Sequence, residues 1–256
     1  MGSIVLLDLF ECQYNGVEAV LKDYFERPYV ASRMRVFRNQ GDGTFSDVSE
    51  EVGLDRARSP MGANYGDIDN DGWLDVYLGT GGPPFEHLAP NVLLRNINGH
   101  EFRDVTASAR VGHLQKGHGI AFGDYDGDGD QDFYAQLGGF SPDDKFHDAL
   151  FRNPGNSNHW ITMRLVGKET NRPAIGARVE VVIEEGGAKR SLHRVVHSGG
   201  SFGANSLQLE VGLGAADEIA KIIVKWPVST TTQTIENVGV NQRIEIVEGE
   251  TDYRKL

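Results

Sequence analysis

The sequence predicts an all-β protein: a partial β-propeller with two full blades and the start of a third, followed by a small antiparallel β-sandwich. A unit of 57 residues repeats without a gap, so that Asp67 recurs as Asp124. Such a period is typical of propeller blades, which are built from four short strands each. The 32 glycines suit many tight turns. After residue 157 the Asp-rich loops stop and runs of alternating apolar residues begin, which predicts a second unit.

Residues 1–33 are predicted to end a preceding blade and to add a short helix. Residues 7–10 resemble the strands that follow the Asp-rich loops. Asp8 would then be the ninth residue of a loop whose first eight residues lie before this chain. We therefore expect the C-terminal part of a longer propeller protein; the alternative is a chance match at the start of a small complete one. Residues 16–26 have helical apolar spacing, with one face formed by Val17, Val20, Leu21, Tyr24 and Phe25.

Residues 34–157 are predicted to form the repeats. Each unit reads as a strand, a tight turn, a short strand, a loop of about a dozen residues, and two strands around an Asp-rich loop. An Arg-Asn pair recurs with the same period, at Arg38, Arg95 and Arg152. We expect this pair to hold strand ends by hydrogen bonds to backbone carbonyls or to Asp47 and Asp104.

Two Asp-rich loops, residues 67–75 and 124–132, fit the pattern D-x-D-x-D-G-x-x-D. Like charges this close repel, and a hard cation that takes six to eight oxygen ligands removes that cost. Neither loop is an EF-hand, because Leu78 and Ala135 stand where the bidentate Glu would be. We therefore predict two Ca²⁺ sites, with position seven contributing its backbone carbonyl. The predicted ligands are Asp67, Asp69, Asp71, Trp73 and Asp75 in one loop, and Asp124, Asp126, Asp128, Asp130 and Asp132 in the other.

Residues 158–250 are predicted to form the sandwich, and residues 251–256 a tail. A cluster of turn residues at 153–158 marks the boundary. Alternating apolar residues predict seven strands, at 160–166, 177–183, 191–197, 206–211, 220–226, 232–235 and 242–247.

These motifs resemble two known modules. The repeats, with Phe-Arg-Asn, residues 42–45 and the Asp-rich loops, resemble FG-GAP/VCBS repeats, which also build the calcium-binding propellers of integrin α-subunits. Asn158, Trp160, residues 171–179, 198–202 and 212–214, and Trp226-Pro227 resemble the ASPIC/UnbV domain. Val211 and Val228-Ser229 depart from that pattern, but these departures do not affect any proposed calcium ligand. The combination resembles the C-terminal end of proteins related to cartilage acidic protein and its bacterial relatives. The resemblance implies an extracellular or cell-surface location and a role in adhesion or ligand binding.

Composition narrows the possible partners. A net charge of −12 argues against nucleic acid, and the absence of a transmembrane run argues against membrane insertion. The single cysteine, Cys12, excludes an intrachain disulfide. The early apolar run is too short for a signal peptide, so an exported, cell-surface or periplasmic protein would have its signal outside this chain.

Few residues suggest catalysis. The sequence lacks a nucleophile elbow, a P-loop and a zinc-protease helix motif. His113 and His118 are either an acid–base pair with an Asp or residues of a loop surface or strand edge. His193 and His197 share a strand face and are expected to face solvent, with metal binding as the alternative. Trp73 either stacks on a sugar or, as we favour, packs on a neighbouring blade.

The sequence therefore predicts a non-enzymatic, calcium-stabilised extracellular module that binds a protein or carbohydrate ligand. The alternative is the C-terminal part of a propeller lyase or hydrolase acting on carbohydrate, with its active site elsewhere. Open blade edges would allow self-association.

Overall fold

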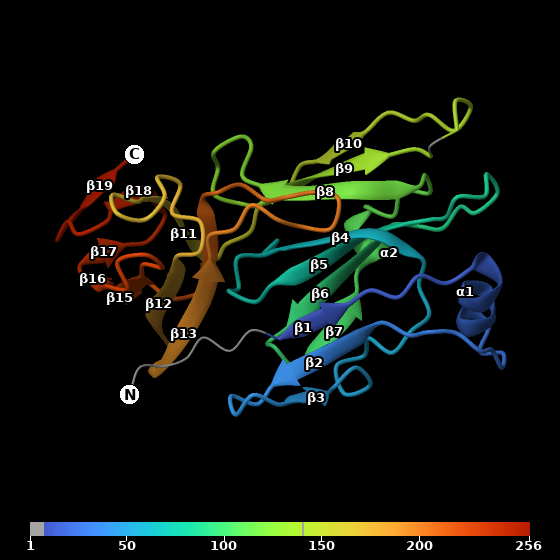
Figure 1. Ribbon diagram of the computed structural model, residues 1–256, viewed down its shortest axis with the longest axis horizontal. Helices are drawn as coiled ribbons and strands as arrows, with labels where there is room; N and C mark the ends of the chain where they lie inside the picture. Colours follow the sequence, from blue (N-terminus) through green and yellow to red (C-terminus); the bar gives the residue numbers. More distant parts are fainter. Residues whose placement is uncertain (1–7, 140) are drawn as a thin grey trace.

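The computed structural model describes residues 8–139 and 141–256 and contains five small sheets (Figure 1). Strands account for 43% of the residues and helices for 5%, so the predicted all-β class is confirmed. Three of the sheets come from the repeats and two from the C-terminal part. The predicted helix forms as α1 (Val17–Tyr24), between the first two strands.

The three repeat sheets follow one another along the chain. The first contains β1 (Leu9–Glu11), β2 (Arg35–Asn39) and β3 (Phe45–Asp47). The second contains β4 (Pro60–Gly66), β5 (Asp75–Thr80), β6 (Val92–Ile97) and β7 (Glu101–Asp104). The third contains β8 (Gly117–Gly123), β9 (Asp132–Leu137) and β10 (Ala149–Phe151). A short helix that the sequence did not reveal, α2 (Thr106–Ala109), follows β7.

The sheets are out of phase with the sequence repeat. The first two strands of each 57-residue unit join the sheet of the preceding hairpin: β5 pairs with β6, with Val76 opposite Leu94. The prediction counted one blade per unit, two of them full. The structure instead has one four-stranded sheet flanked by two three-stranded sheets, because a hairpin pairs with the strand that follows it along the chain.

Apolar residues between neighbouring sheets hold the repeats together. One cluster joins the first two sheets and includes Met34, Val36, Leu54, Leu78 and Leu94, all buried. Another joins the second and third sheets, where Tyr77 and Phe133 lie with ring centroids 4.4 Å apart. Burial of this kind, at about 25 cal/mol per Å², is the main force that keeps the sheets face to face.

The sandwich has all seven predicted strands. One sheet has the order β14 (Leu209–Gly214), β11 (His159–Val166), β18 (Gln242–Val247), β19 (Tyr253–Lys255). The other has β13 (Ala188–Val195), β12 (Arg178–Glu185), β15 (Glu218–Lys225), β16 (Thr232–Ile235), with β17 (Val238–Gly239) also on β15. Residues of both sheets share one buried core that includes Trp226.

Two details of the predicted sandwich were wrong. The sheet is not wholly antiparallel, since β11 and β18 run parallel, with Ile161 opposite Gln242. Residues 251–256 are not a free tail, because β19 pairs with β18 and adds an edge strand. A three-residue strand carries too little alternation to be recognised in sequence.

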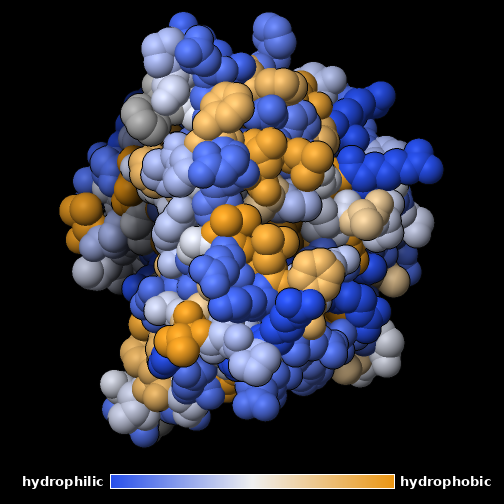
Figure 2. Space-filling model, turned by 90° about the vertical axis from the view of Figure 1, so that its right-hand side faces the viewer, coloured by the Kyte–Doolittle hydropathy of each residue, from blue (hydrophilic) through white to orange (hydrophobic). Residues whose placement is uncertain are grey.

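The apolar face of α1 is exposed rather than packed. No residue of this helix is buried, and the side chains of Leu21, Tyr24 and Phe25 are 50%, 74% and 61% exposed. Figure 2 views this end of the molecule, where hydrophobic patches lie among charged side chains. Among the described residues, no helix has the length and apolar character needed to span a membrane.

Candidate functional site

The two Asp-rich loops connect the strands of two hairpins. The first acidic loop (residues 67–75) joins β4 to β5, and the second acidic loop (residues 124–132) joins β8 to β9. Gly72 and Gly129, the sixth residue of each loop, have φ angles of +90° and +93°. A residue with a Cβ is strained there, so the glycine of the motif allows the chain to turn around its own carboxylates.

The loops share one hydrogen-bond pattern. At position one, Oδ2 of Asp67 or Asp124 accepts the N–H of Gly72 or Gly129, at 3.0 Å in both. At position nine, Oδ2 of Asp75 or Asp132 accepts the N–H of the second loop residue, at 2.9 and 3.2 Å. Oδ1 of the same residues accepts the N–H of Asn96 or Asn153, at 2.8 and 2.7 Å. These bonds fix the carboxylates before any ligand binds.

Three carboxylates converge in each loop. Ligand atoms of Asp67, Asp69 and Asp71 lie within 4.8 Å of one another, as do those of the matching set, Asp124, Asp126 and Asp128. Oδ1 of Asp67 and Oδ1 of Asp69 are buried without a hydrogen-bond partner, whereas Asp69 Oδ2 is ion-paired with Arg95. A buried carboxylate oxygen without a donor is costly, and a divalent cation is the partner that several such oxygens can share. The donor set, all oxygen, therefore fits Ca²⁺.

The other predicted ligands lie beside these groups. Asp75 and Asp132 are outside the two convergent sets and use both oxygens to close their loops. Asp130 turns toward the first loop, where its Oδ1 accepts Nδ2 of Asn70 at 3.0 Å. Trp73 remains a predicted carbonyl ligand. The convergent sets thus contain positions one, three and five.

The first acidic loop is buried beneath the sandwich. The guanidinium of Arg194, on β13, lies 3.3 Å from Asp67 Oδ2, and the N–H of Gly212 donates to the same oxygen at 3.2 Å. Arg190 donates to the carbonyl of Asp71 at 2.7 Å. Sequence reasoning missed these residues, because nothing in the spacing of a distant strand reveals that it faces this loop.

The second acidic loop is more open. Asp126 and Asp128 are paired with Arg152, at 2.7 and 3.7 Å, and Asp128 is exposed. Oε1 of Glu210, on β14, accepts the N–H of Asp124 at 3.2 Å, which adds a sixth carboxylate near the five of the loop. In the first loop, Arg194 pairs with Asp67 and Arg95 with Asp69, so two of its four carboxylates have a counter-charge. In the second loop, five carboxylates and Glu210 surround the single pairing arginine, Arg152, among the described residues.

Burial and crowding raise the pKa of several of these carboxyls. Burial, with nearby Asp71 and Asp69, raises the pKa of Asp67 to about 7 although Arg194 opposes the shift. Burial raises the pKa of Asp75 to about 8, against the two backbone N–H groups that favour its charged form. Burial also raises the pKa of Asp71, Asp130 and Asp132. Without a bound cation, the ionised form of these carboxyls is therefore energetically unfavourable.

The expectation for the recurrent Arg-Asn pairs holds in part: the side chains of Asn96 and Asn153 donate to backbone carbonyls, at 3.2 Å from Leu74 and 2.6 Å from Ile68, but the arginines do not pair with Asp47 or Asp104. Arg95 and Arg152 pair with Asp69 and Asp126, the third residue of each loop, and Arg38 pairs with Glu51. The backbone N–H of each asparagine donates a hydrogen bond to a carboxylate of the preceding hairpin. Asp8 Oδ1 does this for Asn39 at 2.8 Å, as expected of a ninth loop residue.

The remaining candidate residues pack inside the molecule. Trp73 contacts Gly99 in the turn of its own sheet and lies 5.7 Å from the guanidinium carbon of Arg190, so it packs as favoured, though not on a neighbouring blade. His113 lies edge-on to Phe146, and His118 to Phe202. Within the described part of the chain neither histidine bonds to a carboxylate.

The expectation that His193 and His197 face solvent was wrong. Both are half-buried and line a small cavity between the repeats and the sandwich. His197 lies beyond the end of β13, and its Nε2 is 2.5 Å from the Tyr65 hydroxyl. Tertiary packing, not strand spacing, decides where these side chains point.

The two acidic hairpin loops lie on small propeller-type sheets that are joined to a β-sandwich, an arrangement that defines a β-repeat protein. Comparison with protein families agrees: residues 22–78 match the family described as FG-GAP-like repeat, and residues 167–252 match the family described as ASPIC and UnbV. Residues 22–78 are thus similar to an FG-GAP-like repeat and residues 167–252 to an ASPIC/UnbV domain, which agrees with the resemblance. A search of the curated proteins gave no match. FG-GAP repeats in a propeller fold suggest a binding or adhesion-type module.

Proposed function

We propose that this protein is a non-enzymatic, calcium-stabilised binding or adhesion module that works outside the cell or at its surface. The observation that carries the proposal is a pair of converging carboxylate sets, held by loops that repeat the same hydrogen bonds. In the first acidic loop, Oδ1 of Asp67 and Oδ1 of Asp69 also lack a hydrogen-bond partner. FG-GAP repeats are typical of extracellular proteins, which supports the location. The ligand would be a protein or a carbohydrate.

Calcium would act by binding only the folded loops. A ligand that binds the native state alone raises the free energy of unfolding by about 2.7 kcal/mol at a concentration of 100 Kd. Asp67, Asp69 and Asp71 would hold one ion, and Asp124, Asp126 and Asp128 the other. The loops would then become stiff connections between strands, so that the surfaces that bind a partner keep a fixed shape.

Thermal unfolding in excess chelator and in millimolar calcium, with magnesium as the control, tests the proposal. We expect a rise in midpoint that is specific to calcium. Asp69→Ala and Asp126→Ala should each weaken calcium binding measured by titration calorimetry, while Glu236→Gln, on an exposed turn of the sandwich, should not. Equal midpoints in chelator and calcium, or unchanged calcium affinity in both Asp variants, would contradict the assignment.

A further inference from the structure

The two acidic loops are in direct contact with each other. Nδ2 of Asn70, in the first acidic loop, donates to the carbonyl of Gly129 at 3.1 Å and to Oδ1 of Asp130 at 3.0 Å, both in the second acidic loop. Asn70 is only 3% exposed, and its φ angle of +55° lies in the left-handed region that asparagine tolerates better than most residues. A change in the shape of one loop is therefore transmitted to a buried side chain of the other.

A second connection joins the first residues of the two loops. The N–H of Asp67 donates to Oε1 of Gln131, the eighth residue of the second acidic loop, at 2.6 Å. Nε2 of Gln131 donates to Oε2 of Glu210 at 2.6 Å, and Oε1 of Glu210 accepts the N–H of Asp124 at 3.2 Å. These two side chains, which we call the Gln131–Glu210 bridge, therefore hold the first aspartate of each convergent carboxylate set, and one of them comes from the sandwich.

A third contact reaches the second residue of the first acidic loop. Nδ2 of Asn153 donates to the carbonyl of Ile68 at 2.6 Å, while the N–H of Asn153 donates to Oδ1 of Asp132, the ninth residue of the second acidic loop, at 2.7 Å. Positions one, two and four of the first acidic loop are thus held by groups that belong to the second loop or are bonded to it. The shape of the first candidate metal centre therefore depends on the shape of the second.

Two bound dications would repel each other, so the charge around them also matters. The loops contain nine aspartates, and Glu210 adds a tenth carboxylate. Three arginines, Arg95, Arg152 and Arg194, pair with these carboxylates, which leaves seven of the ten negative charges when all are ionised. Two dications supply only four positive charges, so the centres remain in a negative field after both ions have bound. Repulsion between the ions is therefore offset.

We propose that the two centres bind calcium cooperatively, with Asn70 and the Gln131–Glu210 bridge as the coupling groups. An ion in the second acidic loop fixes Gly129, Asp130 and Gln131, and these residues fix the first acidic loop in the shape that its own ion needs. The conformational entropy of the shared residues is lost at the first binding step, so the second ion binds more tightly, and the coupling is reciprocal. This inference rests on the proposed function and adds its regulation: the module becomes stiff over a narrow range of calcium concentration.

Calcium titration of the isotope-labelled full chain, followed by NMR, tests the coupling, because one amide reports on each site. The N–H of Gly72 donates to Asp67 Oδ2 and that of Gly129 to Asp124 Oδ2, so each amide signal should shift as its own loop binds calcium. Asp126→Ala removes one carboxylate of the second set and no group that contacts the first acidic loop. We expect the calcium concentration that half-saturates the Gly72 signal to rise about five-fold or more, the usual lower limit for coupled sites.

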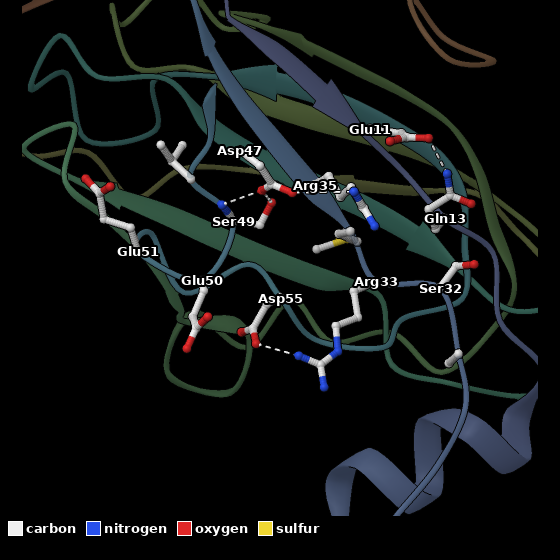
Figure 3. A pocket seen from close by; sticks show the side chains of 13 residues that line it. Glu11, Gln13, Ser32, Arg33, Arg35, Asp47, Ser49, Glu50, Glu51 and Asp55 are labelled. Carbon is white, nitrogen blue, oxygen red and sulfur yellow. Dashed lines mark hydrogen bonds and ion pairs between the residues drawn. The ribbon is translucent and has the colours of Figure 1, made fainter. Parts of the chain in front are cut away.

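Two further backgrounds separate coupling from the effect of charge alone. Gln131→Met breaks the Gln131–Glu210 bridge, and Asn70→Ala breaks the direct contact between the loops. In each background Asp126→Ala should shift the Gly72 midpoint less than it does in the otherwise unaltered chain. Glu50→Gln is the matched control, since it removes one negative charge from an exposed residue that lines the groove of about 710 Å³ beside the first sheet, outside both loops (Figure 3). It should leave the Gly72 midpoint unchanged.

Three outcomes would overturn the inference. An unchanged Gly72 midpoint in Asp126→Ala would show that the sites are independent, and a lower midpoint would show that the two ions repel each other. An equal shift in the unaltered chain and in both backgrounds would show that charge alone acts between the loops. The first comparison needs neither background variant to fold. Calcium shifts at Gly72 and Gly129 without this dependence overturn only the coupling, whereas absence of calcium shifts at both amides overturns the proposed function.

Discussion

Asp8, Asp75 and Asp132 each bind the backbone N–H of an asparagine on the next strand, at 2.7–2.8 Å. The asparagine side chain in turn accepts an N–H from the turn that follows, as Asn39 does from Gly41 and Asn153 from Gly155, at 2.9 and 3.1 Å. One carboxylate thus ties a hairpin to its neighbour. At the scale of the residue, the recurrence of the Arg-Asn pair follows from this contact, since Arg95 and Arg152 pair with the aspartate at the third position of the same loop.

The two glycines of the second acidic loop predict unequal effects of alanine. Both have positive φ angles, +79° for Gly127 and +93° for Gly129. A Cβ on Gly129 would lie 1.9 Å from the Trp160 ring, while one on Gly127 would meet only Arg243, at 3.8 Å. In urea unfolding we expect Gly127→Ala to cost about 1 kcal/mol from backbone strain and Gly129→Ala about 1–3 kcal/mol more. Equal losses would show that Trp160 does not pack there.

Glu248 predicts an acid-dependent loss of stability. Although burial alone would raise its pKa, hydrogen bonds from Ser229, Lys168 and Thr170 lower it to about 2. A depressed pKa contributes stability that is complete above the unfolded value, about 4.5, and is lost as the pH falls through about 2. Glu248→Gln should lose about 1.5–3 kcal/mol at neutral pH. Its deficit against the wild type in urea unfolding should shrink below pH 4.5; a constant deficit would refute the assignment.

At the scale of the element, the loop of residues 198–205 connects the sandwich to two repeat sheets. Ser201 forms an antiparallel bridge with Ala63 of β4. Oδ1 of Asn205 accepts the N–H of Phe122, on β8, at 2.9 Å and the amide of Asn64, on β4, at 2.8 Å. Its Nδ2 donates to the carbonyl of Tyr65 at 2.7 Å. The loop therefore holds β4 and β8 at a fixed separation.

Removal of this bridge should loosen β8 locally. Asn205→Ala leaves the N–H of Phe122 and the carbonyl of Tyr65 without their partner, which should cost about 2–3 kcal/mol. Hydrogen exchange at the Phe122 amide should accelerate, while exchange at the amides of β16 should not change. As a control, Thr234→Ala, at an exposed position of β16, should leave exchange at the Phe122 amide unchanged. Unchanged exchange at Phe122 would mean that the sheets stay in place without the loop.

At the scale of the whole molecule, the first acidic loop is the junction between repeats and sandwich. Arg194 and Gly212 bind Asp67, the N–H of Gly214 binds the carbonyl of Asn70 at 2.8 Å, and Asn158 donates to the carbonyl of Asp69 at 2.7 Å. Because these contacts surround the candidate metal centre, we expect its cation to stabilise the junction as well as the hairpin.

Arg194→Met tests this coupling. It would leave Asp67, which is only 1% exposed, without its counter-charge, and removal of one partner of a buried ion pair costs about 3–5 kcal/mol. Thermal unfolding in chelator should show that loss, and millimolar calcium should recover much of it, because a cation replaces the missing charge. Arg178→Met, at an exposed position on β12, is the control. The same loss of thermal stability in chelator and in calcium would show that Arg194 is not coupled to the metal centre.

Much of this fold could be predicted from local sequence patterns. The 57-residue period, the alternation of the strands and the helix at residues 16–26 were all readable, because each depends on neighbours along the chain. The spacing of Asp67, Asp69 and Asp71, and of Asp124, Asp126 and Asp128, likewise predicted which carboxylates converge. The ninth aspartate remains a predicted ligand, and its oxygens also accept the backbone N–H groups that close the loop, which spacing alone does not reveal.

The sequence by itself determined the all-β class, the repeat, the two acidic loops and the order of the two modules. Only the tertiary structure decided that sheet and repeat are out of phase, that Arg194 and Asn205 join the sandwich to the repeats, and that β11 and β18 run parallel. The physical reason is that strand and turn signals are local, whereas pairing between distant strands and counter-charges from distant loops depend on how the whole chain packs.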